Sequence, residues 1–307
     1  MSEFIFEIEG TDFGRNIALW LALMAAILHA SFGALQKGRH DPWLSRGAID
    51  LNYFMIMLPV ALFVVPWPEP KMWLIFFFAW LIHTIYKWFQ AEAYSRGAYT
   101  VVYPIVRGTS PLLTIFIAGI LFGERFSNVQ WIGVLIMCLG IFGIAFYNLH
   151  NTSVDKKVLR MAILLAIFTG GGAAAYTAFD AFGIRQTYNP FTFIAWLFVF
   201  DGIVFPIVAA IRLKRMSNMP KLIPLYIRGL AGGIIAIFSF GAIMLATRLD
   251  KVGEAAVLRE TSTIFAAIIG YFFLKETVGI IRFLMITLIA IGAVAVSYTH
   301  LTLPTKA

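Results

Sequence analysis

Long apolar runs recur along the whole chain of 307 residues, each separated from the next by a few polar or turn-forming residues. Each run is close to the roughly 20 residues that a helix needs to cross the hydrocarbon core of a bilayer. Backbone groups in lipid must find their hydrogen bonds within the segment, so runs of this kind form helices. The pattern predicts an all-α membrane protein with ten transmembrane helices, at residues 17–36, 48–67, 72–95, 99–122, 128–147, 158–184, 190–211, 222–247, 253–274 and 279–297.

A polar stretch near the middle of the chain divides these runs into two groups of five. Because five is odd, the second group enters the membrane in the opposite sense to the first. Secondary transporters use such inverted repeats for alternating access, with the site near the bilayer midplane. We expect a tail at 1–16, a first repeat at 17–147, a linker at 148–157, a second repeat at 158–297 and a non-native or disordered tail at 298–307.

The composition agrees with a membrane protein. Hydrophobic residues make up 60% of the chain and charged residues 13%, against about 45–50% and about 25% in soluble domains. The net charge of +8 is explained by basic loops at an anionic leaflet, so we expect no nucleic-acid partner. The single Cys138 excludes an intramolecular disulfide and a Cys-rich metal site, and nothing in the sequence calls for a metal or a cofactor.

One motif occurs in both halves, inside apolar segments and in register at an offset of 152 residues. Arg107, Thr109 and Ser110 correspond to Arg259, Thr261 and Ser262. An arginine in the middle of a bilayer costs about 2.5–3.5 kcal/mol on insertion scales, so it normally faces a cavity or a partner. Either the two guanidinium groups hold a carboxylate or phosphate of a substrate, or they form internal ion pairs that lock the halves together.

The polar groups near the motif and elsewhere in the apolar runs have the same two possible roles, one in binding and one in structure. The hydroxyls of the motif either bond a substrate or bond back to their own helix. Carboxyls and imidazoles in the apolar runs either carry a coupling proton or balance charge and pack. The substrate-binding candidates are Arg107, Arg259, Thr109, Ser110, Thr261, Ser262, Tyr86, Gln90, Tyr103 and Tyr176, and the proton-coupling candidates are Asp180, Asp201, Glu260, His29 and His83.

Three local devices are expected to be structural. Lys87 and Glu92 form a pair near a helix end, and Ser127 and Gln130 have the spacing of a capping box at the start of the fifth span. Glu124 and its counterpart Glu276 are helix-start residues, with Glu124 set against the positive end of the fifth span.

The repeated segments resemble a known family. Tyr-Pro-Ile-Val-Arg-Gly-Thr-Ser-Pro-Leu-Leu at 103–113, Leu-Phe-Gly-Glu-Arg at 121–125 and the second copy at 258–276 are similar to EamA-type permeases of the drug/metabolite transporter superfamily. The resemblance covers about residues 17–297 and implies ten helices in two five-helix repeats. It also implies export or exchange of amino acids, nucleobases, sugars or other metabolites. Met285 departs from the pattern, since it stands where the repeat places the counterpart of Gly133.

Together these features predict a multi-pass transporter of the inner membrane that moves a small polar metabolite, amino acid-like or an organic anion, by alternating access. Its partners would be that substrate, the lipid bilayer and, as an open alternative, a second copy of the chain. The rival classes are a membrane scaffold or receptor and an intramembrane enzyme, for which no catalytic motif is present. Lys and Arg outside the spans number 14 on one side and 7 on the other, which favours both termini outside, whereas some relatives imply the opposite.

Overall fold

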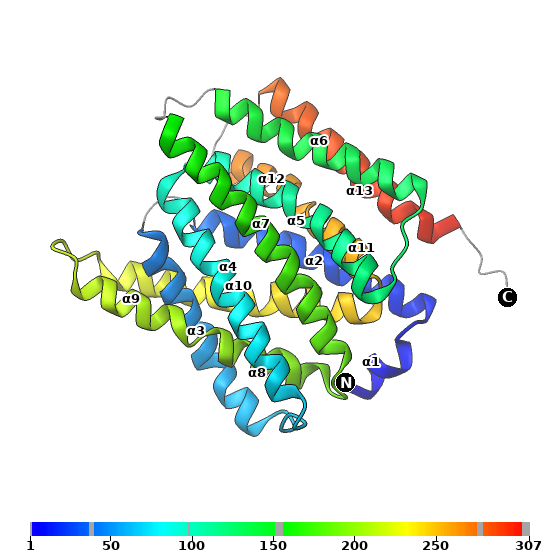
Figure 1. Cartoon of the computed structure of the whole chain (residues 1–307), viewed down its shortest axis with the longest axis horizontal. Helices are drawn as coiled ribbons and strands as arrows, with labels where there is room; N and C mark the ends of the chain where they lie inside the picture. Colours follow the sequence, from blue (N-terminus) through cyan, green and yellow to red (C-terminus); the bar gives the residue numbers. More distant parts are fainter. Residues whose placement is uncertain (1, 37–39, 98, 151–155, 275–278, 303–307) are drawn as a thin grey trace.

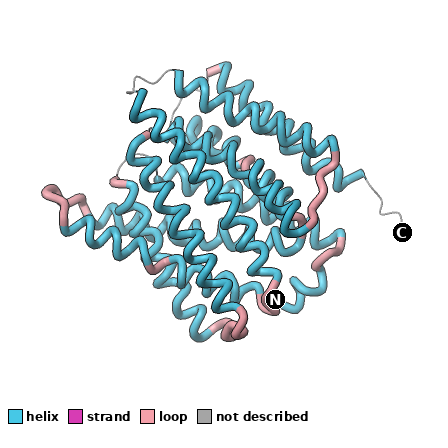
Figure 2. Tube along the Cα trace, viewed as in Figure 1, coloured by secondary structure: helices cyan, strands magenta, loops and turns pink. Residues whose placement is uncertain are grey.

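The computed structural model describes residues 2–36, 40–97, 99–150, 156–274 and 279–302, and all regular structure within these ranges is helical (Figure 2). The first half contains α1 (Ser2–Ile8), α2 (Asp12–Gln36), α3 (Pro42–Phe63), α4 (Met72–Arg96), α5 (Tyr99–Phe122) and α6 (Asn128–His150). The second half contains α7 (Lys156–Arg185), α8 (Pro190–Asp201), α9 (Val204–Lys214), α10 (Leu222–Leu249), α11 (Val252–Arg259), α12 (Ser262–Leu274) and α13 (Ile280–Thr302).

The prediction of an all-helical membrane protein is confirmed. Among the described residues, eight segments are long and apolar enough to cross a bilayer, with α8 and α9 counted together as Pro190–Lys214. The last two predicted spans are also helical but are shorter than this among the described residues, since α12 has 13 residues and the apolar part of α13 is Phe283–Val296. The helix α13 continues to Thr302, so the first residues of the predicted tail are helical, and residues 303–307 lie outside the described ranges.

Two of the apolar segments in the second half are interrupted inside the bundle. The helix α8 ends at Asp201 and α9 begins at Val204, while α11 ends at Arg259 and α12 begins at Ser262. In the first half, α5 continues without interruption through Pro104 and Pro111. The two copies of the arginine motif therefore differ locally, since a helix break follows the arginine in the second copy alone.

Helix packing follows a common scheme in both halves (Figure 1). The helix α4 packs along α7, and α10 packs along α2. In the same way α5 packs on α7, while α11 and α12 pack on α2. The helices α6 and α13 pair with each other, and α3 packs on α8 and α9. Exchanging the halves in chain order maps this set of pairs onto itself, as expected for two related repeats.

The α6–α13 pair lies at one edge of the bundle (Figure 1), and glycines let its backbones approach closely. A Cβ atom on Gly292 would lie 2.5 Å from the carbonyl oxygen of Gly133. The side chain of Met285 packs against Gly143, so the residue that departs from the repeat fills space that this glycine leaves, while its carbonyl oxygen lies against Gly140. Small residues at helix interfaces have this role in membranes.

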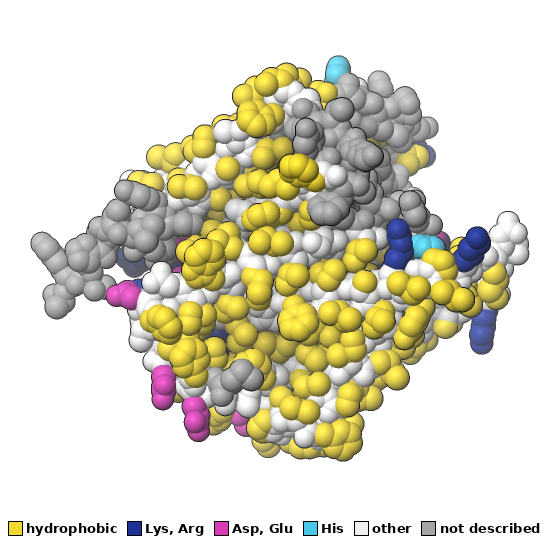
Figure 3. Space-filling view, turned by 180° about the vertical axis from the view of Figure 1, so that it is seen from behind, with side chains coloured by type: hydrophobic (Ala, Val, Ile, Leu, Met, Phe, Trp, Pro, Cys, Tyr) yellow, Lys and Arg dark blue, Asp and Glu magenta, His cyan; other side chains and the backbone are white. Residues whose placement is uncertain are grey.

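The outer surface has the polarity of a protein that spans a bilayer. Hydrophobic side chains cover the broad face in Figure 3, with acidic side chains at one end and Lys and Arg at the other. Since the exposed aromatic and aliphatic side chains of α4 and α6, such as Leu74 and Leu139, lie on the outside of the bundle, they are suited to contact lipid tails rather than water.

Candidate functional site

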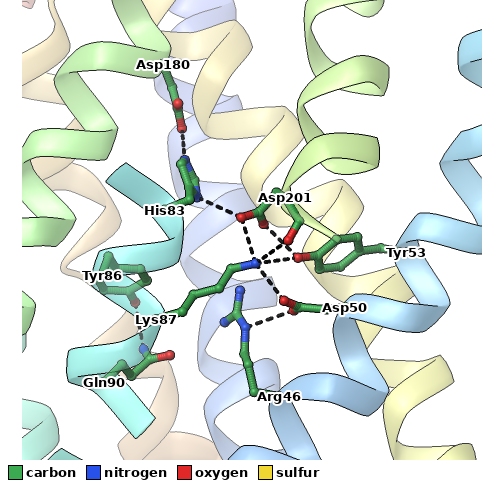
Figure 4. Close-up of polar contacts among 9 residues, drawn as sticks. All are labelled: Arg46, Asp50, Tyr53, His83, Tyr86, Lys87, Gln90, Asp180 and Asp201. Atoms are coloured by element: carbon green, nitrogen blue, oxygen red, sulfur yellow. Dashed lines mark hydrogen bonds and ion pairs between the residues drawn. The ribbon is translucent and has the colours of Figure 1, made fainter. Parts of the chain in front are cut away.

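Seven polar side chains from four helices meet in the interior of the bundle (Figure 4). We call this set the lysine cluster. Its members are Arg46, Asp50 and Tyr53 of α3, His83 and Lys87 of α4, Asp180 of α7, and Asp201 at the end of α8. All seven are buried, so their charges must be balanced within the cluster or by a ligand.

Lys87 lies at the centre of this cluster. Its Nζ is 2.6 Å from Asp50 Oδ2 and 2.6 Å from Asp201 Oδ1. The same ammonium donates hydrogen bonds to Tyr53 Oη at 2.7 Å and to the carbonyl oxygen of Asp201 at 2.8 Å. Tyr53 in turn donates to Asp201 Oδ2 at 2.7 Å. One cation therefore ties the first half, through α3 and α4, to the end of α8 in the second half.

His83 extends the cluster toward α7. Its Nε2 is 2.9 Å from Asp180 Oδ2, and its Nδ1 is 3.5 Å from Asp201 Oδ1. Both ring nitrogens therefore face carboxylates. An ionised carboxylate only accepts hydrogen bonds, so a neutral imidazole can satisfy one of these two contacts and an imidazolium can satisfy both.

Two predictions about this region are wrong. Lys87 does not pair with Glu92; Glu92 pairs with Arg96 at 2.7 Å, on the outside of the helix. Arg46 does not belong to a loop, since α3 begins at Pro42 and places Arg46 Nε 2.9 Å from Asp50 Oδ1 inside the bundle. The physical reason is the cap of α3, where Asp41 accepts hydrogen bonds from the next backbone amides and starts the helix well before residue 48.

A second group of polar side chains surrounds the two arginines of the repeated motif. Arg107 Nη1 is 3.1 Å from Glu260 Oε1, and Arg107 Nη2 donates to Ser262 Oγ at 3.0 Å. The Nε of Arg107 donates to Tyr103 Oη at 3.1 Å. Since Glu260 and Ser262 flank the break between α11 and α12, Arg107 joins α5 to that break. The ion-pair interpretation therefore applies to Arg107.

Arg259 is different. Its side chain is 2% exposed, yet its one hydrogen bond within the described part of the chain runs from Nη2 to Thr177 Oγ1, at 3.4 Å. The Nε and Nη1 atoms of Arg259, and the Oε2 atom of Glu260, have no hydrogen-bond partner among the described residues. A buried guanidinium with free donors is costly unless an anion or water meets it.

A narrow cavity, lined by both polar and apolar side chains, runs beside these groups. One part of it adjoins the lysine cluster and the other adjoins Arg107, and the two parts share Arg46, Tyr86 and Phe240. Each part holds about 20 Å³ of open space, which is room for about one water molecule. The Arg107 part is lined by polar and aromatic side chains, among them His29, Tyr86, Gln90, Tyr103, Arg107, Ser110 and Tyr176.

The structure thus brings most of the predicted site residues together. His83, Asp180 and Asp201 line the first part of the cavity. The hydroxyl of Thr109 donates to the carbonyl oxygen of Ile105 at 2.8 Å, and that of Thr261 donates to the carbonyl oxygen of Leu258 at 2.7 Å. Both hydroxyls therefore bond back to their own chain segment, as in the second alternative given above. Ser262 contacts Arg107, and Tyr86 accepts a hydrogen bond from Gln90 at 2.6 Å.

Glu124 starts a helix, but not the one predicted. Its carboxylate accepts hydrogen bonds from the backbone amides of Val252 at 2.6 Å and Gly253 at 3.0 Å, at the start of α11 in the other half. The start of α6 is satisfied instead by the predicted capping box, in which the amide of Gln130 donates to Ser127 Oγ at 3.3 Å. Because Ser127 already caps the start of α6, Glu124 is available to cap α11 in the other half. Its counterpart Glu276 lies outside the described residues.

No group of three or more His, Cys, Asp or Glu side chains in the described ranges is arranged to hold a metal ion. Within the lysine cluster the carboxylate oxygens face cations of the chain itself, such as Lys87 and Arg46.

Comparisons with known proteins agree with this architecture. The sequence model of the EamA-like transporter family matches residues 16–146 and again residues 160–298. A solved structure titled "Crystal structure of protein" superposes on the chain with a TM-score of 0.73 at 16% identity, covering 94% of this chain and 100% of that one. At this identity the likeness concerns the fold alone. The comparison with curated proteins gave no match.

Proposed function

Since this chain belongs to the EamA-like transporter family, we propose that it is a secondary transporter of the inner membrane that moves a small polar solute by alternating access. The ten predicted spans would form two inverted repeats, with the cavity between them as the transport site. The symmetric packing of the two halves supports this arrangement. The acidic end with α1 (Figures 1 and 3) would face the outside, because basic loops favour the cytoplasm.

The observation that carries the substrate class is the buried guanidinium of Arg259, two of whose donor atoms have no partner among the described residues. A carboxylate or phosphate accepts two parallel hydrogen bonds from such a group. Arg107, the arginine of the first copy of the motif, lines the cavity. The solute is therefore an anion or a zwitterion, such as an amino acid or an organic acid, and its other polar groups would meet Gln90, Ser110 and the cavity tyrosines.

A ligand screen on the purified protein tests this proposal first. Amino acids, nucleosides, sugars and organic acids are added in turn and the melting temperature is measured, because a ligand that binds only the folded state raises it. We expect at least one carboxylate-bearing solute to raise the melting temperature in a saturable way. A response confined to uncharged solutes contradicts the proposed substrate class, and no response to any solute contradicts the transport site.

Charge balance in the lysine cluster supports a coupled proton. Arg46 and Lys87 oppose three carboxylates, those of Asp50, Asp180 and Asp201. The cluster is neutral when His83 is an imidazolium and carries one net negative charge when it is not. Since the imidazolium also satisfies both carboxylates that face its ring, a single proton on His83 would link α4 to α7 and α8, and its loss would weaken that link.

His83→Gln is expected to remove the response of transport to a pH gradient while exchange at equal pH continues. The reason is that glutamine keeps a polar side chain near Asp180 but cannot carry the proton. The measurement is solute flux in proteoliposomes with and without an imposed pH gradient. His150→Gln, at an exposed helix end, is the matched control and should respond as the wild type does. A full gradient response in the His83 variant would contradict the assignment.

A further inference from the structure

The ammonium of Lys87 has more oxygen neighbours than it has protons to donate. Four oxygens lie within 2.8 Å of Nζ, from the carboxylates of Asp50 and Asp201, the hydroxyl of Tyr53 and the main-chain carbonyl of Asp201. An ammonium group offers three donors. An ion pair whose only task was to neutralise Lys87 would need one carboxylate. Three of the four oxygens accept the hydrogen bonds that the ammonium can donate. Asp201 Oδ1, at 2.6 Å, is a fourth oxygen beyond that number.

Part of this oxygen set comes from the end of a broken helix. The helix α8 ends at Asp201, and the chain passes through Gly202 and Ile203 before α9 begins. The end of α8 carries the negative pole of the helix dipole. In transporters, such unwound carbonyls and half-helix ends coordinate Na⁺ or take part in proton binding. Lys87 Nζ lies at that end and donates a hydrogen bond to the carbonyl oxygen of Asp201, at 2.8 Å.

The surroundings of the ammonium are those of a desolvated cation. Lys87 is 1% exposed. Its Nζ also lies 5.5 Å from the centre of the Tyr53 ring and 5.6 Å from that of Phe205 in α9, within the range of a cation–π contact. The cation therefore touches the segments on both sides of the break as well as α3.

The geometry points to a monovalent-cation site, formed by Asp50, Tyr53 and Asp201, that the tethered ammonium of Lys87 fills in place of a free ion. The chain supplies its own cation from α4, so its fold and its transport cycle do not depend on Na⁺. This inference deepens the proposed function by naming the charge that occupies the coupling region, and it rests on that function only for its role in transport. The site itself is tested without a transported solute.

Lys87→Met tests the site, because methionine fills the volume of the lysine stem and leaves the four oxygens without a cation. The melting temperature of the purified variant is measured in sodium chloride and in choline chloride at equal ionic strength. We expect Na⁺ to raise it in a saturable way and choline to have no such effect, since choline is too large for the site. The wild type should melt at the same temperature in both salts.

Two controls make the result specific. Lys71→Met removes one positive charge from an exposed position at the start of α4 and should show no sodium response. Lys87→Met/Asp50→Asn removes one of the carboxylates and should lose the response that Lys87→Met gained.

Three results overturn the inference. One is a folded Lys87→Met protein whose melting temperature is the same in both salts. Another is a saturable sodium response of the wild type that Asp50→Asn abolishes. The third is a Lys87→Met protein that fails to fold even in sodium-rich buffer, because Na⁺ is then unable to take the place of the ammonium. None of these depends on finding the solute, so they are separate from a failure of the ligand screen.

Discussion

Arg107→Met is expected to destabilise the folded protein by about 3–5 kcal/mol, the cost of removing one partner of a buried ion pair. Glu260 is fully buried, and one of its carboxylate oxygens lies 3.1 Å from Arg107 while the other has no described partner. Without Arg107 the carboxylate loses its ion pair inside the bundle. The measurement is the change in unfolding free energy of purified protein in detergent.

Two further variants separate the ion pair from a general effect of substitution. Arg107→Met/Glu260→Gln removes both charges and should recover much of the lost stability, although the protein should still fail to bind the solute. Arg96→Met breaks the Glu92–Arg96 pair, in which the arginine side chain is 51% exposed, and should cost about 0–1 kcal/mol. If Arg107→Met lowers the unfolding free energy no more than Arg96→Met does, the ion pair between Arg107 and Glu260 does not stabilise the fold.

Unlike Arg107→Met, Arg259→Met is expected to leave the stability of the folded protein unchanged. It should instead lower the affinity for the solute about 100-fold. Within the described ranges Arg259 makes a single long hydrogen bond, to Thr177. Glu260 keeps its pair with Arg107 when Arg259 is removed. One charge-assisted hydrogen bond to a bound anion is worth about 1.5–3 kcal/mol. The measurement is the solute concentration that gives half of the maximal rise in melting temperature.

The contrast between the two arginines is itself informative. A variant of Arg259 that binds the solute as tightly as the wild type would assign this residue to structure alone. A variant that loses several kcal/mol of stability would mean that its unpaired atoms meet ordered water or a fixed ion in the folded state. Both outcomes would leave the substrate class without its main support.

Both helix breaks of the second half are held by a cation from the first half. Lys87 of α4 contacts Asp201 at the end of α8, and Arg107 of α5 contacts Glu260 between α11 and α12. A break leaves backbone carbonyls that need partners, and an acid at the break attracts a cation from the opposite repeat. These two ion pairs are therefore the contacts that relative motion of the halves would stretch or exchange.

The sequence is sufficient to predict the helical segments, the two repeats and the capping box at Ser127. These features follow from the length of the apolar runs and from local spacing. The predicted span begins at residue 48, so it misses the start of α3 at Pro42, leaving Arg46 in a loop and Asp50 only two residues inside the span. Their spacing with Tyr53, at positions i, i+4 and i+7, does indicate one polar helix face and was the available signal.

Long-range partners had no such signal. Glu124 caps α11 from a position 128 residues away, and no periodicity reports that contact. The break at Glu260 was equally hidden, because the prolines lie in the unbroken α5 and the broken segment has none. Helix propensity alone would place a break at the prolines of α5 and none between α11 and α12. The break between α11 and α12 is therefore set by tertiary contacts, above all by those of Arg107 with Glu260 and Ser262.

In alternating access, one site between the two halves is exposed in turn to the two sides of the membrane. Counterflow in proteoliposomes tests it most directly, with vesicles that hold an excess of the unlabelled solute from the ligand screen and an outside solution with a trace of labelled solute. The account predicts transient accumulation of label above its equilibrium level in the wild type and none in Arg259→Met. Label that only approaches equilibrium in the wild type, at the rate of empty vesicles or of a pore, would contradict the account.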